Sequence, residues 1–139
     1  MTHPLILAIQ PGFHYFPLAA GSKKPAFSEN WRELSTTKLD QIEAWVHDGY
    51  NLGIDCEKST LLVVDCDGNE GMEAWAELKQ SWEWAATLEV KTPHGRHYYY
   101  HGSAPSSVGK IAPHVDIRSR GGYVVAPGST VDGTEYFID

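Results

Sequence analysis

The apolar residues of this 139-residue chain follow two different spacings, and each spacing predicts one kind of element. Short apolar runs rich in Val, Ile and aromatic residues, bounded by Gly, Pro, Asn or Asp, predict strands. Apolar positions three or four residues apart predict helices with one buried side. The expected strands are residues 12–18, 51–56, 61–67, 87–92, 96–101, 115–118, 123–127 and 135–138. The expected helices are residues 38–48 and 70–82, after a short helical segment at 5–10.

Each of the two longer helices has an apolar stripe that should face the core. The stripe of the first helix consists of Leu39, Ile42, Trp45 and Val46. The stripe of the second helix consists of Met72, Trp75, Ala76 and Leu78. We expect Asn69 to cap the second helix, because an Asn side chain can accept hydrogen bonds from the first turn. Residues 81–86 should form a loop or a frayed helix end.

Two hairpins follow from the spacing of the strands. Residues 51–56 and 61–67 are separated by a short turn, so we expect residues 51–54 to lie beside the end of the strand 61–67. Residues 87–92 and 96–101 are joined by the tight turn Pro93-His94-Gly95. The small and polar residues between 102 and 113 predict a loop.

The charge of the chain limits how it could hold nucleic acid. With 18 acidic and 11 basic side chains, the formal net charge is −7. A domain that grips nucleic acid by itself is usually basic. We therefore expect a small local basic patch that acts with help from elsewhere, or no tight binding of nucleic acid by this domain alone.

The sequence also limits where the protein works. No apolar run is long enough to cross a membrane, and the start of the chain lacks the features of a secretory signal. Cys56 and Cys66 have no CxxC neighbour, so we do not expect a zinc site. Without a secretory signal, both are expected to be reduced thiols of a cytoplasmic protein.

The strand 61–67 ends in the first candidate for chemistry, Asp65-Cys66-Asp67. Side chains alternate along a strand, so Asp65 and Asp67 share one face and Cys66 points to the other. Two neighbouring carboxylates repel each other, and a divalent cation such as Mg²⁺ or Mn²⁺ would offset that repulsion. The pair taken alone fits equally well with two solvated acids at the exit of a strand.

Further candidates lie later in the chain. His97 follows the Pro-His-Gly turn, and Asp116 lies in a short strand before a Gly-Gly turn. Three carboxylates can hold two metal ions of the kind that promote phosphoryl transfer. Cationic side chains in the same half of the chain suit triphosphate oxygens, and they are Lys91, Arg96, Lys110, Arg118 and Arg120. Lys23, on an earlier loop rich in Gly and Ser, could also reach an anionic ligand.

These residues resemble the primase–polymerase domain of the archaeo-eukaryotic primase superfamily, which occurs in phage, plasmid and mobile-element replication proteins. The matching segments occur in the family's order and span nearly the whole chain. They read GSKKP at 21–25, NLGI at 51–54, VVDCDG at 63–68, TPHGRHYYY at 92–100, GK at 109–110 and VDIRSRGGYVVAP at 115–127. A single Asp-x-Asp is weak evidence, whereas this ordered set is specific.

The resemblance implies a role for each candidate. Asp65, Asp67 and Asp116 correspond to catalytic carboxylates that bind two Mg²⁺ or Mn²⁺ ions. His97, in the small–x–His motif, corresponds to a catalytic residue that contacts the phosphates of the incoming nucleotide. Arg118 should face the same side of its strand as Asp116 and contact the triphosphate. The other nucleotide-binding candidates are Arg96, Lys110 and Lys23.

The resemblance also implies a fold. That fold is an α+β palm related to the RNA-recognition fold, in which a mainly antiparallel sheet carries the metals and helices flank it. One departure concerns the positions shortly after the motif histidine, where many family members carry Arg and this chain has Tyr100 and His101. The chain contains no GxxxxGK[ST] helicase motif.

The expected function is that of a template-directed DNA primase/polymerase, a nucleotidyltransferase of phage, plasmid or mobile-element replication. Its partners would be nucleoside triphosphates and a single-stranded or primed DNA template, with no membrane. Two alternatives remain open: a metal-dependent nuclease or phosphohydrolase that uses the same acids, and a non-catalytic nucleotide- or origin-binding module. We expect residues 1–139 to be one catalytic domain, the N-terminal part of a longer replication protein with a helicase domain downstream.

Overall fold

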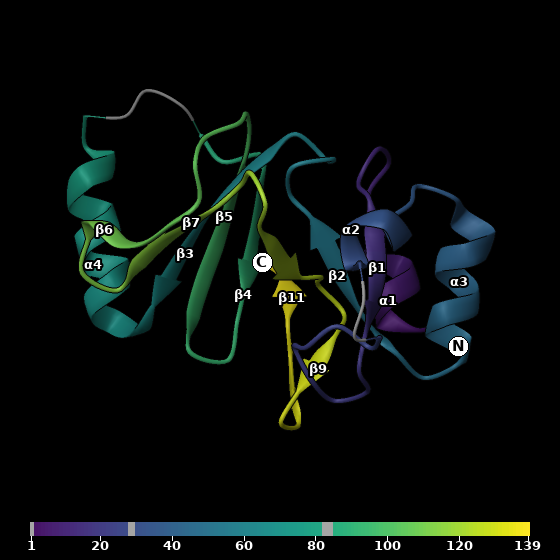
Figure 1. Cartoon of the computed structure of the whole chain (residues 1–139). Coiled ribbons are helices and arrows are strands. Elements are labelled where there is room, and N and C mark those ends of the chain that lie inside the picture. The colour runs from purple at the N-terminus through teal and green to yellow at the C-terminus, as the bar shows by residue number, and fades with distance from the viewer. Residues whose placement is uncertain (1, 28–29, 82–84) are drawn as a thin grey trace.

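The computed structural model of the chain describes residues 2–27, 30–81 and 85–139. It is an α+β fold with antiparallel sheets, as the resemblance implied (Figure 1). Its helices are α1 (Pro4–Leu7), α2 (Trp31–Leu34), α3 (Leu39–His47) and α4 (Gly68–Lys79). Its strands are β1 (Tyr15–Leu18), β2 (Asn51–Asp55), β3 (Leu61–Asp67), β4 (Leu88–Lys91), β5 (Gly95–His101), β6 (Ser107–Ala112), β7 (Val115–Arg118), β8 (Tyr123–Val125), β9 (Thr130–Val131), β10 (Thr134–Glu135) and β11 (Phe137–Ile138).

The described strands form two main sheets and one small hairpin. The six-stranded sheet has the order β11-β4-β5-β3-β7-β6, and the three-stranded sheet has the order β1-β2-β8. Every pairing in both sheets is antiparallel. In Figure 1 the six-stranded sheet and α4 lie on one side of the molecule, and the three-stranded sheet with α1 and α3 lies on the other.

The alternation of side chains along β3 directs the two faces of the six-stranded sheet to different surroundings. Leu61 and Val63 join the larger core, which also contains the inner residues of the three-stranded sheet. Val64 and Cys66 join a second core under α4, where Trp75 packs edge-on against a tyrosine of β5. Because Asp65 and Asp67 continue the face of Leu61 and Val63, they face away from α4 and toward the three-stranded sheet.

The predicted pairing of 51–56 with 61–67 is wrong. The strand β2 pairs with β1 and β8, whereas β3 pairs with β5 and β7. The short turn after β2, with Thr60 at a φ of 54°, carries the chain from one sheet into the other. All residues of β2 are buried, so this strand needs a neighbouring strand on each edge. Which strands pair depends on which apolar faces can be buried together, and not on the length of the connecting turn.

Several local predictions also need correction. The segment 102–113 contains the strand β6, an exposed edge strand with an irregular register whose polar sequence has no clear strand pattern. The helix α4 begins directly after Asp67, so Asn69 lies inside the helix and is not its cap. Leu39 and Leu78 are 52 % and 40 % exposed, and Ala76 is exposed as well, so the buried stripes are narrower than predicted. The helix α2 was not predicted.

Other predictions agree with the structure. The strands β4 and β5 form the expected hairpin, and Ile42, Trp45 and Val46 are buried on α3. The early elements are shorter than predicted, with α1 ending at Leu7 and β1 starting at Tyr15. Both cysteines are buried free thiols.

In the described ranges, no helix is long and apolar enough to span a membrane. The predicted loop or helix end at 81–86 falls largely on residues 82–84, outside the described residues.

Candidate functional site

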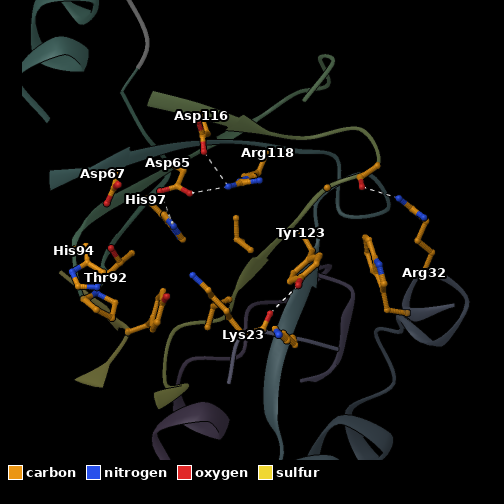
Figure 2. Close-up of a pocket in the computed structure, with 18 residues that line it drawn as sticks. Lys23, Arg32, Asp65, Asp67, Thr92, His94, His97, Asp116, Arg118 and Tyr123 are labelled. Carbon is orange, nitrogen blue, oxygen red and sulfur yellow. Dashed lines mark hydrogen bonds and ion pairs between the residues drawn. The ribbon is translucent and has the colours of Figure 1, made fainter. Parts of the chain in front are cut away.

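Three side chains stand in a row across the middle of the six-stranded sheet. Asp65 of β3 is the direct register partner of His97 on β5 and of Asp116 on β7. Direct partners on antiparallel strands point to the same face, so all three face the three-stranded sheet. Figure 2 shows Asp65, Asp116, His97 and Arg118 directed toward one another. The pairing of distant strands therefore brings together residues that are up to 53 positions apart, as Asp65 and Arg118 are.

Both carboxylates of this row are held by protein groups. Nη2 of Arg118 lies 3.1 Å from Oδ2 of Asp116 and 3.5 Å from Oδ2 of Asp65, so a single guanidinium nitrogen bridges the two acids. Nε2 of His97 lies 3.3 Å from the other oxygen of Asp65. The backbone N–H of Gly109 donates a 2.9 Å hydrogen bond to the other oxygen of Asp116.

These contacts keep Asp65 ionised. Burial by itself would raise the pKa of its carboxyl, but the hydrogen bond from His97 and the positive charge of Arg118 outweigh burial and hold the pKa below its ordinary value. The imidazole of His97 is only 8 % exposed. Its second nitrogen, Nδ1, is buried and has no hydrogen-bond partner in the described part of the chain. A buried polar atom without a protein partner is usually satisfied by water.

Asp65, Asp67 and Asp116 together form the acidic wall of the site. Asp67 differs from the other two acids. It is the last residue of β3, it is exposed, and it lines the same cavity as Asp65 and Asp116. Within the described chain its carboxylate makes no hydrogen bond or ion pair with another side chain. Among residues 2–27, 30–81 and 85–139, no three His, Cys, Asp or Glu side chains are already gathered as a metal cluster.

The three aspartates line a cavity of about 700 Å³ between the two main sheets. This volume lies within the range of about 300–1,000 Å³ that is usual for small-molecule sites. The six-stranded sheet and the turn after β4 form one wall of the cavity, and β8, α2 and the loop after β1 form the other. Its lining is Lys23, Lys24, Trp31, Arg32, Asp65, Asp67, Thr92, Pro93, His94, His97, Asp116, Arg118, Gly121, Gly122, Tyr123, Val124, Val125 and Tyr136.

The wall opposite the acids is basic. Lys23 and Arg32 lie across the cavity from Asp65 and Asp116 in Figure 2. The Tyr123 hydroxyl donates a 2.8 Å hydrogen bond to the backbone oxygen of Lys23, which ties this loop to β8. Arg32 donates a 2.9 Å hydrogen bond to the backbone oxygen of Gly121. An anionic ligand that also carries divalent cations would therefore meet complementary charge on both sides.

The predicted site residues do not all reach this cavity. Asp65, Asp67, Asp116, His97, Arg118 and Lys23 line it. Arg96 points to the opposite face of β5 from His97 and forms an ion pair with Asp139. Lys110 is exposed on the edge strand β6. Neither Arg96 nor Lys110 is part of the described lining.

Sequence reasoning missed part of the cavity wall. Trp31 and Arg32 belong to α2, whose four residues are too few to show a helical pattern. Tyr136 lies with its ring 6.0 Å from that of His97, and it comes from a segment that was predicted only as a further strand. Tyr123 lay inside one of the segments that carried the resemblance, so its position was a usable signal.

Comparison with known protein families places these residues in a wider context. A protein-family model described as bifunctional DNA primase/polymerase, N-terminal, matches residues 5–138. A comparison with curated proteins found no match. The matched range includes both walls of the cavity, with Asp65, His97 and Asp116.

Proposed function

The chain belongs to the family of bifunctional DNA primase/polymerase N-terminal domains, and from this we propose that it is a template-directed nucleotidyltransferase that extends or starts DNA chains. The observation that carries the proposal is the cavity between the two sheets, with Asp65, Asp67 and Asp116 on one wall and Lys23 and Arg32 on the other. The family supports primase/polymerase activity with nucleotide and DNA substrates. Service in phage, plasmid or mobile-element replication is part of the proposal, as the resemblance suggests.

The acidic wall fits divalent metal ions in its chemistry. Carboxylate oxygens are the ligands that Mg²⁺ and Mn²⁺ prefer, and this wall offers three carboxylates on one face of one sheet. Asp65, Asp67 and Asp116 would hold the ions, and two ions is the number we propose. Bound in this position, the ions would lower the pKa of the attacking hydroxyl and offset the negative charge of the phosphates.

The proposed reaction is an in-line displacement at phosphorus. The oxygen of a primer 3′-hydroxyl forms a bond to the α-phosphorus of a nucleoside triphosphate, the bond from that phosphorus to the bridging oxygen of the leaving pyrophosphate breaks, and the hydroxyl proton passes to solvent water. Lys23 and Arg118 bind the triphosphate oxygens from the two sides of the cavity. His97 is 3.3 Å from Asp65 and largely buried, so we propose that it orients this carboxylate in addition to the phosphate contact implied by the resemblance.

The proposal is tested by primer extension with Mn²⁺, a primed single-stranded DNA template and labelled nucleotides. We expect the primer to lengthen with the wild-type chain and to stay unchanged with Asp65→Asn. The matched control is Asp48→Asn, which removes an exposed carboxylate at the end of α3. Circular dichroism would check that each variant is folded.

Each other outcome has a clear meaning. A primer that shortens would replace the proposal with a metal-dependent nuclease or phosphohydrolase. Nucleotide binding without any change in the primer would favour a non-catalytic binding module, a reading to which the net charge of −7 lends some support. Equal extension by wild type and Asp65→Asn would exclude the acidic row as the catalytic site.

A further inference from the structure

We propose that Arg118 is a built-in cation that holds Asp65 and Asp116 until the phosphates of a nucleotide draw it away, so that cation binding and nucleotide binding are coupled at this site. The inference rests on the proposed function in one respect: it takes the cavity as the place where an anionic nucleotide and divalent cations bind together. It concerns the order and the mutual dependence of these two binding events.

The position of Arg118 is the first step of the argument. Its Nη2 atom lies between the two carboxylates, 3.1 Å from Oδ2 of Asp116 and 3.5 Å from Oδ2 of Asp65 (Figure 2). The side chains of Asp65 and Asp116 are only 24 % and 22 % exposed, so their charges are less screened by water than those of surface acids. The guanidinium therefore offsets the repulsion between two carboxylates that are direct neighbours on adjacent strands.

The occupancy of the carboxylate oxygens is the second step. His97 and the Gly109 N–H contact the oxygens of Asp65 and Asp116 that Arg118 leaves free. Of the three aspartates on this wall, only Asp67 has no such partner within the described residues. A divalent cation that joined Asp65 to Asp116 would need the position of the Arg118 nitrogen, and two cations cannot share it. Asp67 is therefore the acid that is open to a cation first.

The destination of Arg118 is the third step. Its side chain is 37 % exposed and lines the cavity, so its guanidinium can turn toward a ligand there. A guanidinium binds phosphate oxygens through two parallel hydrogen bonds, which makes a triphosphate a suitable new partner. When one ligand removes a competitor of the other, each ligand increases the affinity of the other by the same factor. Nucleotide would thus tighten cation binding beyond the bridging that cations and phosphates provide directly.

The test is the affinity of the chain for Mn²⁺ alone, measured by calorimetry without nucleotide. If Arg118 competes with the cation, Arg118→Leu should bind Mn²⁺ more tightly than wild type, by about tenfold if each of the two ion pairs is worth a few-fold. The matched control is Arg120→Leu, which removes the same charge from an exposed residue outside the described cavity lining. We expect Arg120→Leu to change the Mn²⁺ affinity by less than about twofold.

A second variant guards against a folding defect. Arg118→Lys keeps one positive charge but lacks the planar fork, so its Mn²⁺ affinity should lie between those of wild type and Arg118→Leu. Inorganic tripolyphosphate without metal is the complementary probe, and it should bind wild type more tightly than Arg118→Leu.

The result that overturns the inference is an Mn²⁺ affinity that is equal or lower in both Arg118 variants. Equal tightening by Arg118→Leu and Arg120→Leu would also overturn it, because the effect would then be one of overall charge. Either result, together with intact primer extension by wild type, would leave the proposed function standing. Failure of wild type to extend a primer would leave the Mn²⁺ comparison as a direct test of competition by Arg118.

Discussion

Gly95 explains why the motif before His97 needs a small residue, and it offers a sharp test of the structure. Gly95 is buried on β5 and pairs with Asp67 at the end of β3. A methyl group added to Gly95 would overlap the backbone oxygen of Cys66 and lie 2.9 Å from its carbonyl carbon. Both atoms belong to the backbone of β3, so no side-chain rotation can relieve the contact. The substitution Gly95→Ala must therefore push β5 away from β3.

The cost of this substitution can be estimated from the structure. Overpacking among side chains alone costs about 1–3 kcal/mol, and each backbone hydrogen bond lost between the strands adds about 1 kcal/mol. We therefore expect Gly95→Ala to lower the free energy of unfolding by at least about 3 kcal/mol, which for a domain of this size is a fall of about 10 °C or more in Tm. Primer extension should fall as well, because the displaced segment carries His97 and faces Asp67.

The measurement is urea and thermal unfolding of wild type, Gly95→Ala and Gly133→Ala. Gly133 is exposed, has nothing within 4 Å of an added methyl group, and has a φ of 80°. Its substitution should cost only the backbone strain of a left-handed residue, about 1 kcal/mol. If Gly95→Ala is no less stable than Gly133→Ala, the close approach of β5 to β3 between Gly95 and Cys66 would be refuted.

Two further predictions concern charge. Lys23→Met should raise the KM for nucleoside triphosphate by about fivefold with an unchanged Tm. The control Arg96→Met, on the face of β5 opposite His97, should change the KM by less than about twofold. Similar KM values for both variants would contradict the assignment of the basic wall. Because the pKa of Asp65 is lower in the folded than in the unfolded chain, its contribution to stability is fully present above the unfolded pKa of about 4 and is lost as the pH falls through the folded value. The stability difference between wild type and Asp65→Asn in urea should therefore shrink toward acid pH, and a difference that stays constant with pH would refute this account of the Asp65 contacts.

The sequence predicted much of the acidic wall, because the alternation of side chains along one strand is a local signal. Alternation along β3 separates Asp65 and Asp67 from Cys66, and alternation along β7 keeps Arg118 on the side of Asp116. The structure agrees with both, since Cys66 is in the core under α4 and Arg118 contacts Asp116. Arg96 was chosen as a candidate for its charge alone. Alternation along β5 places Arg96 on the opposite face from His97, so the same rule would have excluded it from the site.

What could not be predicted depends on contacts between distant segments. The turn after β2 suggested a hairpin with β3, but burial of both faces of β2 selects β1 and β8 as its neighbours. Trp31 and Arg32 reach the cavity through α2, which carries no periodic signal of its own. The bridge of Arg118 to Asp65 requires β7 to pair with β3 in one register, and a shift by one residue would point Asp116 to the opposite face.

Residue types and short spacings are enough to predict the order of most elements, the acids and their shared face, and the family resemblance. Three features are visible only in the folded chain: two separate sheets face each other, the basic wall comes from Lys23 and Arg32, and Arg118 lies between Asp65 and Asp116. The physical reason is that strand partners are selected by the burial of whole apolar faces, and this burial couples residues far apart in the chain. The Asp-Cys-Asp pair is thus readable from the chain, but the charges that surround it depend on the fold.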